Sequence, residues 1–498
     1  MRLYSKTKQD DEQTPARITS TQWILVCMPV LIATAGYEVR SYGTLAIITQ
    51  LLAVLNSVLL TLVVKEALSK RVIGKVCLVG SVFIFYWVEA LGLSLQRNPF
   101  SIAEGFPINE SQFDQGLIVQ ALVYVTVFQL LLFVGYSIRP RIARVVVYVA
   151  SRVDSLSFDR SIIGLLLALC AVMPLLIYYE FDYDKIIAAL LASRSATDFD
   201  APEAGLSQHL ALFGLYGAAL FFVYALKTNT WRRFWWLLLG VMAAIPFVSG
   251  GTRHLWLYIS LPSVLIVLRG FKGQLNTRLL GPVAVVFVVL LVAQAQFVYR
   301  TVGWTEVGNV APEELTTINN TGQFTAQLFA QHLVPREHPY FRELVEPYFI
   351  SHWIPRQFWP DKPTMESWAY YNDSYAQGAA YNVTPSVIGQ FHLNWGFPGV
   401  IFIGAWLGFL GFIADRVLLS LNPDRQRAMF VVVGMFYAFI ISSFRFYSPI
   451  YFSYFIFGLL AMLLLTRRQR LSTSVAGFAP ALADRQVFPE LSESSCVR

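Results

Sequence analysis

The sequence predicts an all-α polytopic membrane protein with about twelve transmembrane helices and a large helical periplasmic loop. Composition gives two of the observations: 56% of the 498 residues are hydrophobic and only 14% are charged. Soluble domains have roughly 45 to 50% apolar and about 25% charged residues. The third observation is a succession of apolar runs of about 20 residues, long enough to cross a hydrocarbon core. Since lipid offers no hydrogen bonds to the backbone, runs of this length predict helices.

Twelve apolar runs give the predicted spans. They lie at about 22–38, 43–64, 72–95, 117–138, 161–179, 206–226, 234–249, 254–268, 279–298, 395–415, 429–443 and 449–466. The seventh and eighth are short and are separated only by "SGGTR", so a re-entrant pair is an alternative. That alternative leaves both ends of the pair on their predicted sides.

The distribution of Lys and Arg predicts the orientation. With the N-terminus inside, every inner connection carries at least three of these residues and every short outer connection at most two. Both termini are therefore expected to be cytoplasmic. The net charge of +7 follows mostly from this bias, so we expect no nucleic-acid partner.

The spans divide the chain into five parts. These are a cytoplasmic tail (1–21), spans one to nine (22–298), an outer segment (299–394), spans ten to twelve (395–466) and a second cytoplasmic tail (467–498). A structureless connection as long as the outer segment is uncommon, so we expect it to fold as a cap. Phe324, Leu328 and Phe329 have helical spacing there, and Pro335 follows.

Four arginines lie at the predicted outer ends of spans or in the outer segment. They are Arg253, Arg300, Arg356 and Arg445. Guanidinium groups bind phosphate oxygens in a bidentate manner and do not lose their charge. The set therefore predicts a shared site for a lipid-linked diphosphate at one membrane depth. For each arginine alone, an interfacial anchor or a carboxylate partner is the alternative.

The stretch "SHWIPRQFWPDKP", residues 351–363, surrounds Arg356 with prolines and tryptophans. Prolines restrict the backbone, and Trp359 offers a flat face for a sugar ring or for the membrane interface. Asp361 and Lys362 pair with each other or bind a ligand. The alternative is a rigid lid with an internal ion pair.

The histidines have no metal-binding spacing, so no metal site is expected. No hydrolase, P-loop or dinucleotide fingerprint is present either, and no cofactor is expected. His392, in "GQFHLNWGFPG", is the histidine expected to face a site. Its alternative is a structural role in the core.

Three stretches, in this order and at these topological positions, resemble the O-antigen polymerase (Wzy) or oligosaccharide repeat unit polymerase family. They are "SGGTRHLWL" at 249–257, "IPRQFWPDKP" at 354–363 and "PSVIGQFHLNWGFPGVI" at 385–401. The resemblance implies a GT-C-like inverting glycosyltransferase of the bacterial inner membrane. Such an enzyme transfers a glycan from undecaprenyl diphosphate onto the next lipid-linked repeat unit at the periplasmic face. A flippase and a chain-length regulator are the implied partners.

The resemblance assigns Arg253 and Arg356 to the diphosphate, and topology adds Arg300 and Arg445. Where the family often has Glu, this chain has Gln390, which cannot act as a base. His392 is therefore the first candidate for the general base. Asp361, Glu366 and His254 follow it.

Two rival functions remain open. An O-antigen ligase uses the same donor but transfers the glycan to the lipid A core. A polysaccharide transporter or flippase predicts ionisable residues and broken helices inside the spans. Glu89, Pro174 and Pro262 are the residues that fit the transporter.

Overall fold

The part of the chain that the structure describes is mostly helical. The computed structural model describes residues 43–70, 72–95, 114–138, 215–223, 234–240, 255–270, 322–351, 363–376, 384–421 and 427–449, together with shorter pieces. Its elements in order are α2 (Thr44–Lys70), α3 (Gly74–Val82), η1 (Phe83–Trp87), α4 (Val88–Ser94), α5 (Gln115–Ser137), β1 (Leu156–Ser157), α11 (Leu255–Gly270), α14 (Gln323–Leu333), α15 (Glu346–Ser351), α16 (Glu366–Ala376), α17 (Val387–Ser420), α18 (Arg427–Ser443) and β2 (Arg467–Arg468). The two-residue strands pair antiparallel.

Four of the described helical segments are long and apolar enough to cross a membrane. They are Thr44–Ala67, Gly74–Ser94, Gln115–Ser137 and Val387–Ser420, and shorter apolar stretches lie in α11 and α18. α2 exposes Leu51 and Leu55 by 65% and 62%, as a helix in contact with lipid does. The chain is therefore a membrane protein. The remaining predicted spans are described in part or lie outside the described residues.

The segment Gly74–Ser94 contains a π-helical turn, η1, between α3 and α4. Two aromatic residues of this wider turn are buried and donate hydrogen bonds to other elements. The Trp87 indole N–H donates to the Gln129 side chain (3.0 Å), and the Tyr86 hydroxyl donates to the Phe444 carbonyl (3.1 Å). The turn thus connects this span to α5 and to the chain that follows α18.

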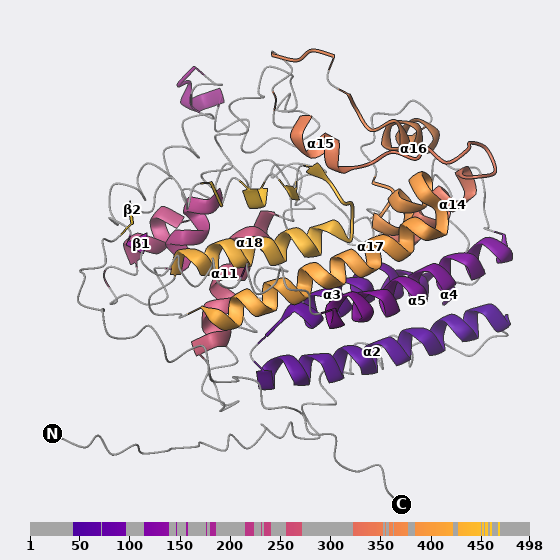
Figure 1. The fold of residues 1–498 in the computed structure, drawn as a ribbon, viewed down its shortest axis with the longest axis horizontal. Coiled ribbons are helices and arrows are strands. Elements are labelled where there is room, and N and C mark those ends of the chain that lie inside the picture. Colours follow the sequence, from indigo (N-terminus) through magenta and orange to yellow (C-terminus); the bar gives the residue numbers. More distant parts are fainter. Residues whose placement is uncertain are drawn as a thin grey trace, which may run out of the picture.

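The longest helix, α17, packs lengthwise against α5 and also contacts α3, α14 and α18 (Figure 1). Small residues let the two backbones come together. A Cβ on Gly408 would lie 2.1 Å from the Leu132 carbonyl oxygen, and one on Gly135 would lie 1.9 Å from the Ala405 carbonyl oxygen. Gly404 and Gly408 are four residues apart, which is the spacing that membrane helices use for close contact.

One end of this bundle, which we call the far end, is held together by Asp415 of α17. Its Oδ1 accepts hydrogen bonds from the Gly74 backbone N–H (2.8 Å) and the Tyr437 hydroxyl. Its Oδ2 accepts one from the Tyr136 hydroxyl. One buried carboxylate therefore joins α17 to α3, α18 and α5.

The helices α14, α15 and α16 gather at the opposite end, which we call the cap end (Figure 1). α14 matches the helix predicted around Phe324 and ends at Leu333, ahead of Pro335, so this prediction is confirmed. Nearly every residue of α14 is buried. α14 packs against α4, η1, α5 and α17 and closes the cap end of the bundle.

Candidate functional site

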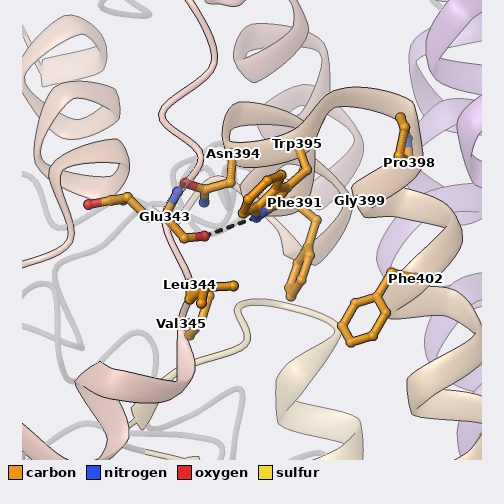
Figure 2. A pocket seen from close by; sticks show the side chains of 9 residues that line it. All are labelled: Glu343, Leu344, Val345, Phe391, Asn394, Trp395, Pro398, Gly399 and Phe402. Carbon is orange, nitrogen blue, oxygen red and sulfur yellow. Dashed lines mark hydrogen bonds between the residues drawn. The ribbon is translucent and has the colours of Figure 1, made fainter.

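The helix α17 is broken at the cap end. Gly396 has φ 64° and ψ −147°, a backbone conformation that only glycine adopts readily. A Cβ on Gly399 would lie 2.4 Å from the Phe391 carbonyl oxygen. In a straight helix, residues eight positions apart are about 12 Å apart. The two halves of α17 therefore fold back on each other, and Figure 2 shows the chain turning over between Trp395 and Pro398.

The break leaves backbone carbonyls of the first half without helical partners, because Pro398 has no N–H to offer to Asn394. The outer segment provides the donors. The Phe341 N–H donates to the Leu393 carbonyl (3.1 Å), and the Arg342 N–H donates to the Asn394 carbonyl (3.0 Å). The cap is therefore fastened to the membrane helix at the break itself.

Glu343 follows directly and connects three elements. Its backbone N–H donates to the Asn394 side chain (3.2 Å), and its carbonyl accepts from the Trp395 indole N–H (3.0 Å). Its carboxylate accepts the N–H groups of Glu366 (2.8 Å) and Ser367 (3.0 Å) at the start of α16. A carboxylate at a helix N-terminus satisfies amides that have no partner inside the helix.

The Glu343 carboxylate also accepts a hydrogen bond from the Tyr348 hydroxyl (3.1 Å). Burial and this neighbouring carboxylate raise the pKa of Tyr348 to about 12. Tyr348 therefore stays protonated at neutral pH and acts as a donor. Glu343 is therefore an organising residue of the cap: it bonds to the first half of α17, to the start of α16 and to Tyr348.

A cavity of about 300 Å³ lies at the break in α17. Its lining comes from the outer segment and from both halves of the helix (Figure 2). The lining residues are Glu343, Leu344, Val345, Phe391, Asn394, Trp395, Pro398, Gly399 and Phe402. The cavity is therefore mostly apolar, and it exists because the helix is broken there.

Gln390 fastens a second segment to the first half of α17. Its amide nitrogen donates to the Tyr447 carbonyl (3.1 Å), and its amide oxygen accepts from the Tyr447 N–H (3.0 Å). The Phe444 carbonyl accepts in turn from the Val387 N–H (3.3 Å). These bonds hold the turn that contains Arg445, whose side chain is exposed. We call residues 444–447, with their two bonds to Gln390, the Arg445 turn.

His392 is fully buried next to this site. Its Nε2 lies 2.8 Å from the Val334 carbonyl oxygen, and its ring packs edge-on against Tyr124 and Tyr340. Because a carbonyl only accepts, Nε2 carries the proton of that bond, and Nδ1 has the free lone pair of the neutral ring. Nδ1 is buried and has no hydrogen-bond partner in the structure. His392 has the lone pair of a base but is enclosed.

Glu89, in α4, is half-buried against the N-terminus of α14. Its carboxylate accepts the backbone N–H groups of Phe324 (2.7 Å) and Thr325 (3.2 Å) and the Thr325 hydroxyl. It therefore caps a helix that lies 235 residues further along the chain. From the sequence, Glu89 is an ionisable residue that fits a transporter. In the structure, its carboxylate accepts three hydrogen bonds from the start of α14.

The structure describes only some of the predicted site residues. Arg253, His254, Arg300, Arg356 and Lys362 lie outside the described residues. Trp359 and Asp361 are exposed near a turn that precedes α16, and Glu366 is exposed at the start of α16. His392 belongs to the first half of α17, and the Arg445 turn contacts that half through Gln390. Among the described residues, no three His, Cys, Asp or Glu side chains gather as a metal site.

Sequence reasoning missed the organising residues Glu343 and Asn394. The letters "NWGFPG", residues 394–399, contain the signal for the break, because glycine and proline two positions apart interrupt a helix. No local signal marks Glu343, since most of its partners are distant: Glu366 lies 23 residues away and Asn394 lies 51 residues away. Comparison with protein-family models, with curated proteins and with solved structures gives no match.

Proposed function

We propose that this chain polymerises undecaprenyl-diphosphate-linked oligosaccharide repeat units into O-antigen or exopolysaccharide, with the cap end at the periplasmic face of the bacterial inner membrane. The observation that carries the proposal is the Arg445 turn. The backbone of Tyr447, two residues after the exposed Arg445, bonds to Gln390. Gln390 lies in the stretch 385–401 that resembles the polymerase family. Twelve spans of a GT-C-like architecture with both termini cytoplasmic belong to the same proposal.

The reaction needs stabilisation of a leaving group and removal of one proton. The acceptor hydroxyl oxygen attacks the anomeric carbon of the donor, the bond from that carbon to the diphosphate breaks, and the lipid diphosphate leaves with the electron pair. Arg445, together with Arg253, Arg300 and Arg356, balances the charge that develops on the diphosphate. No metal ion is required in this scheme.

A base must take the proton of the acceptor hydroxyl. His392 has a free lone pair on Nδ1, but its ring is enclosed by Tyr124 and Tyr340. Asp361 is exposed in the proline and tryptophan stretch. We therefore place Asp361 ahead of His392 as the base. Trp359, exposed by 40%, is proposed to stack on a sugar ring.

The O-antigen ligase is the nearest rival, because it uses the same donor. A deletion strain separates the two functions. Loss of a polymerase leaves a single repeat unit on the lipopolysaccharide or its exopolysaccharide equivalent, whereas loss of a ligase leaves bare core. Single repeat units in the deletion strain are the expected result.

The transport function has one structural observation in its favour, the break in α17, since broken helices also occur in transporters. Glu89, however, is engaged by α14. Purified protein that extends lipid-linked repeats without an energy source would establish polymerisation. Movement of lipid-linked repeats without extension would instead establish transport.

The shared diphosphate site is tested by Arg253→Ala and Arg356→Ala. Each is expected to shorten the polymer severely while the protein still inserts and accumulates, because each removes a bidentate phosphate contact. Polymer length on gels and protein in the membrane fraction are the two readouts. Full-length polymer from both variants would contradict the shared site.

A further inference from the structure

The cavity at the break in α17 has polar residues in its lining whose polar groups already have partners. The Trp395 indole N–H donates to the Glu343 carbonyl, and the Asn394 amide nitrogen donates to Gln390 (3.0 Å) and Ser367 (3.3 Å). Figure 2 shows the Glu343 carboxylate pointing away from the cavity. A sugar or a head group inside would lose its hydrogen bonds to water and gain few in return. The cavity therefore suits an apolar ligand.

The rim of the cavity is exposed and apolar. Leu344, Trp395 and Phe402 are exposed by 60%, 40% and 54%. Phe402 belongs to the second half of α17, which lies in a segment long and apolar enough to cross a membrane. Ile401, beside it, is also exposed, by 39%. The rim thus continues into a helix surface that contacts lipid, so a hydrocarbon chain can enter from the membrane without crossing water.

The same wall connects the cavity to the Arg445 turn. Phe391 lines the cavity and packs against the ring of Tyr447, with a centroid distance of 6.0 Å. The Tyr447 hydroxyl accepts from the Trp406 indole N–H (3.1 Å), one turn beyond Phe402. Arg445 precedes Tyr447 by two residues and is exposed. An apolar cavity next to an exposed cation fits an amphiphile with an anionic head.

We propose that this cavity holds a length of the polyprenyl chain of the donor lipid, next to the diphosphate that Arg445 binds; the proposal rests on the function proposed above. The cavity then fixes the direction from which the donor enters. The chain lies against Phe391 and Phe402, while the glycan extends toward the cap. A phospholipid acyl chain has similar chemistry, so the experiment must separate these two sources.

The full-length protein in lipid nanodiscs is irradiated with one of two probes. The first is a polyprenyl diphosphate with a diazirine in an isoprene unit near the head, and the second is a phosphatidylglycerol with a diazirine in an acyl chain. We expect the first probe to label residues 344–345 and 391–402, and unlabelled polyprenyl diphosphate to compete with it. Labelling of other segments, or equal labelling by the phospholipid, would overturn the proposal.

Two variants provide the matched pair. Leu344→Trp fills the cavity from an exposed position, and Leu419→Trp adds the same side chain to an exposed position of α17 at the far end, away from the cavity lining. We expect Leu344→Trp to lower labelling by about tenfold, which corresponds to lost contact with roughly two methylene groups. Leu419→Trp is expected to label as the unaltered protein does. Equal labelling of the two variants would contradict the site.

The length of the donor chain gives an independent readout. The ratio of polymerisation rates with long-chain and two-isoprene donors should fall in Leu344→Trp and keep its value in Leu419→Trp. If polymer forms but the ratio is unchanged and labelling lies elsewhere, the cavity proposal fails and the polymerase stands. If the cavity is labelled but no polymer forms, the lipid site stands and the polymerase proposal fails.

Discussion

The two ends of α17 use buried polar side chains for different purposes. At the far end, Asp415 has both oxygens engaged by Gly74, Tyr136 and Tyr437, and this network is closed. At the cap end, Gln390 bonds to the backbone of a distant segment that presents an exposed arginine. A buried polar residue in a membrane helix is therefore no sign of function by itself. Function is expected where buried groups hold exposed ones in place.

We expect the strongest loss of stability from a change at the far end. Asp415→Ala leaves the hydroxyls of Tyr136 and Tyr437 without their acceptor and should destabilise the protein by about 3 kcal/mol. Thermal unfolding in detergent and the amount of protein in the membrane fraction measure this loss. Asp415→Asn is the control, because its carbonyl still accepts one bond and a smaller loss is expected. Equal stability of Asp415→Ala and the unaltered protein would contradict the role of Asp415 in joining these helices.

The second prediction concerns the cap end, where Gln390 holds the Arg445 turn. Gln390→Glu removes the donor to the Tyr447 carbonyl and sets a carboxylate against it, which should cost about 2 kcal/mol and displace the Arg445 turn. Polymer should become shorter, as measured on gels. Gln390→Met loses both bonds without placing charge there and should have a milder effect on unfolding. Unaltered polymer length and unfolding in Gln390→Glu would show that the turn needs no such support.

A smaller effect is expected at the start of α14. Glu89→Gln keeps one acceptor for the Phe324 N–H but loses the carboxylate that caps the helix, a loss of about 1 kcal/mol. Limited proteolysis between residues 322 and 345 should become faster. Thr325→Val, which removes only the hydroxyl, is the matched variant and should change proteolysis less. Loss of polymer in Glu89→Gln with unchanged proteolysis would instead indicate a proton-handling role.

The smallest effect concerns Asp114, which is exposed before α5. The Gly116 N–H and then Arg336 lower the pKa of Asp114 below its usual range. These two contacts therefore stabilise the folded protein at pH values above the ordinary pKa of Asp. Their contribution is lost as pH falls through the lowered pKa of Asp114. Asp114→Asn should unfold slightly earlier than the unaltered protein at pH 7. A difference that persists at a pH below the lowered pKa would contradict this origin.

The sequence predicted the described helices well because their signal is local. The apolar runs at 43–64, 72–95 and 117–138 correspond to α2, to α3 through α4 and to α5, and the spacing of Phe324, Leu328 and Phe329 marked α14. The predicted span 395–415 is the second half of α17, and its first half lies in the predicted outer segment. Apolar length cannot show that a helix folds back at Gly396.

The contacts of the candidate site were beyond sequence reasoning because they join distant residues. Gln390 meets Tyr447 across 57 residues, and Glu89 meets Phe324 across 235. The sequence indicated that these groups are polar and lie near the membrane, but their partners depend on packing. His392 illustrates the limit: its neighbours Tyr124 and Tyr340 enclose it, and no spacing rule predicts that.

We propose that the Arg445 turn supports glycan polymerisation on a lipid diphosphate. The most direct measurement gives purified protein in nanodiscs lipid-linked repeat units and no energy source, and resolves the products by length. The unaltered protein should form long polymer, and Arg445→Ala should form only short products. Arg336→Ala, which removes an exposed arginine that follows α14 and bonds to Asp114, should match the unaltered protein. Long polymer from Arg445→Ala, or none from the unaltered protein, would contradict this role of the Arg445 turn.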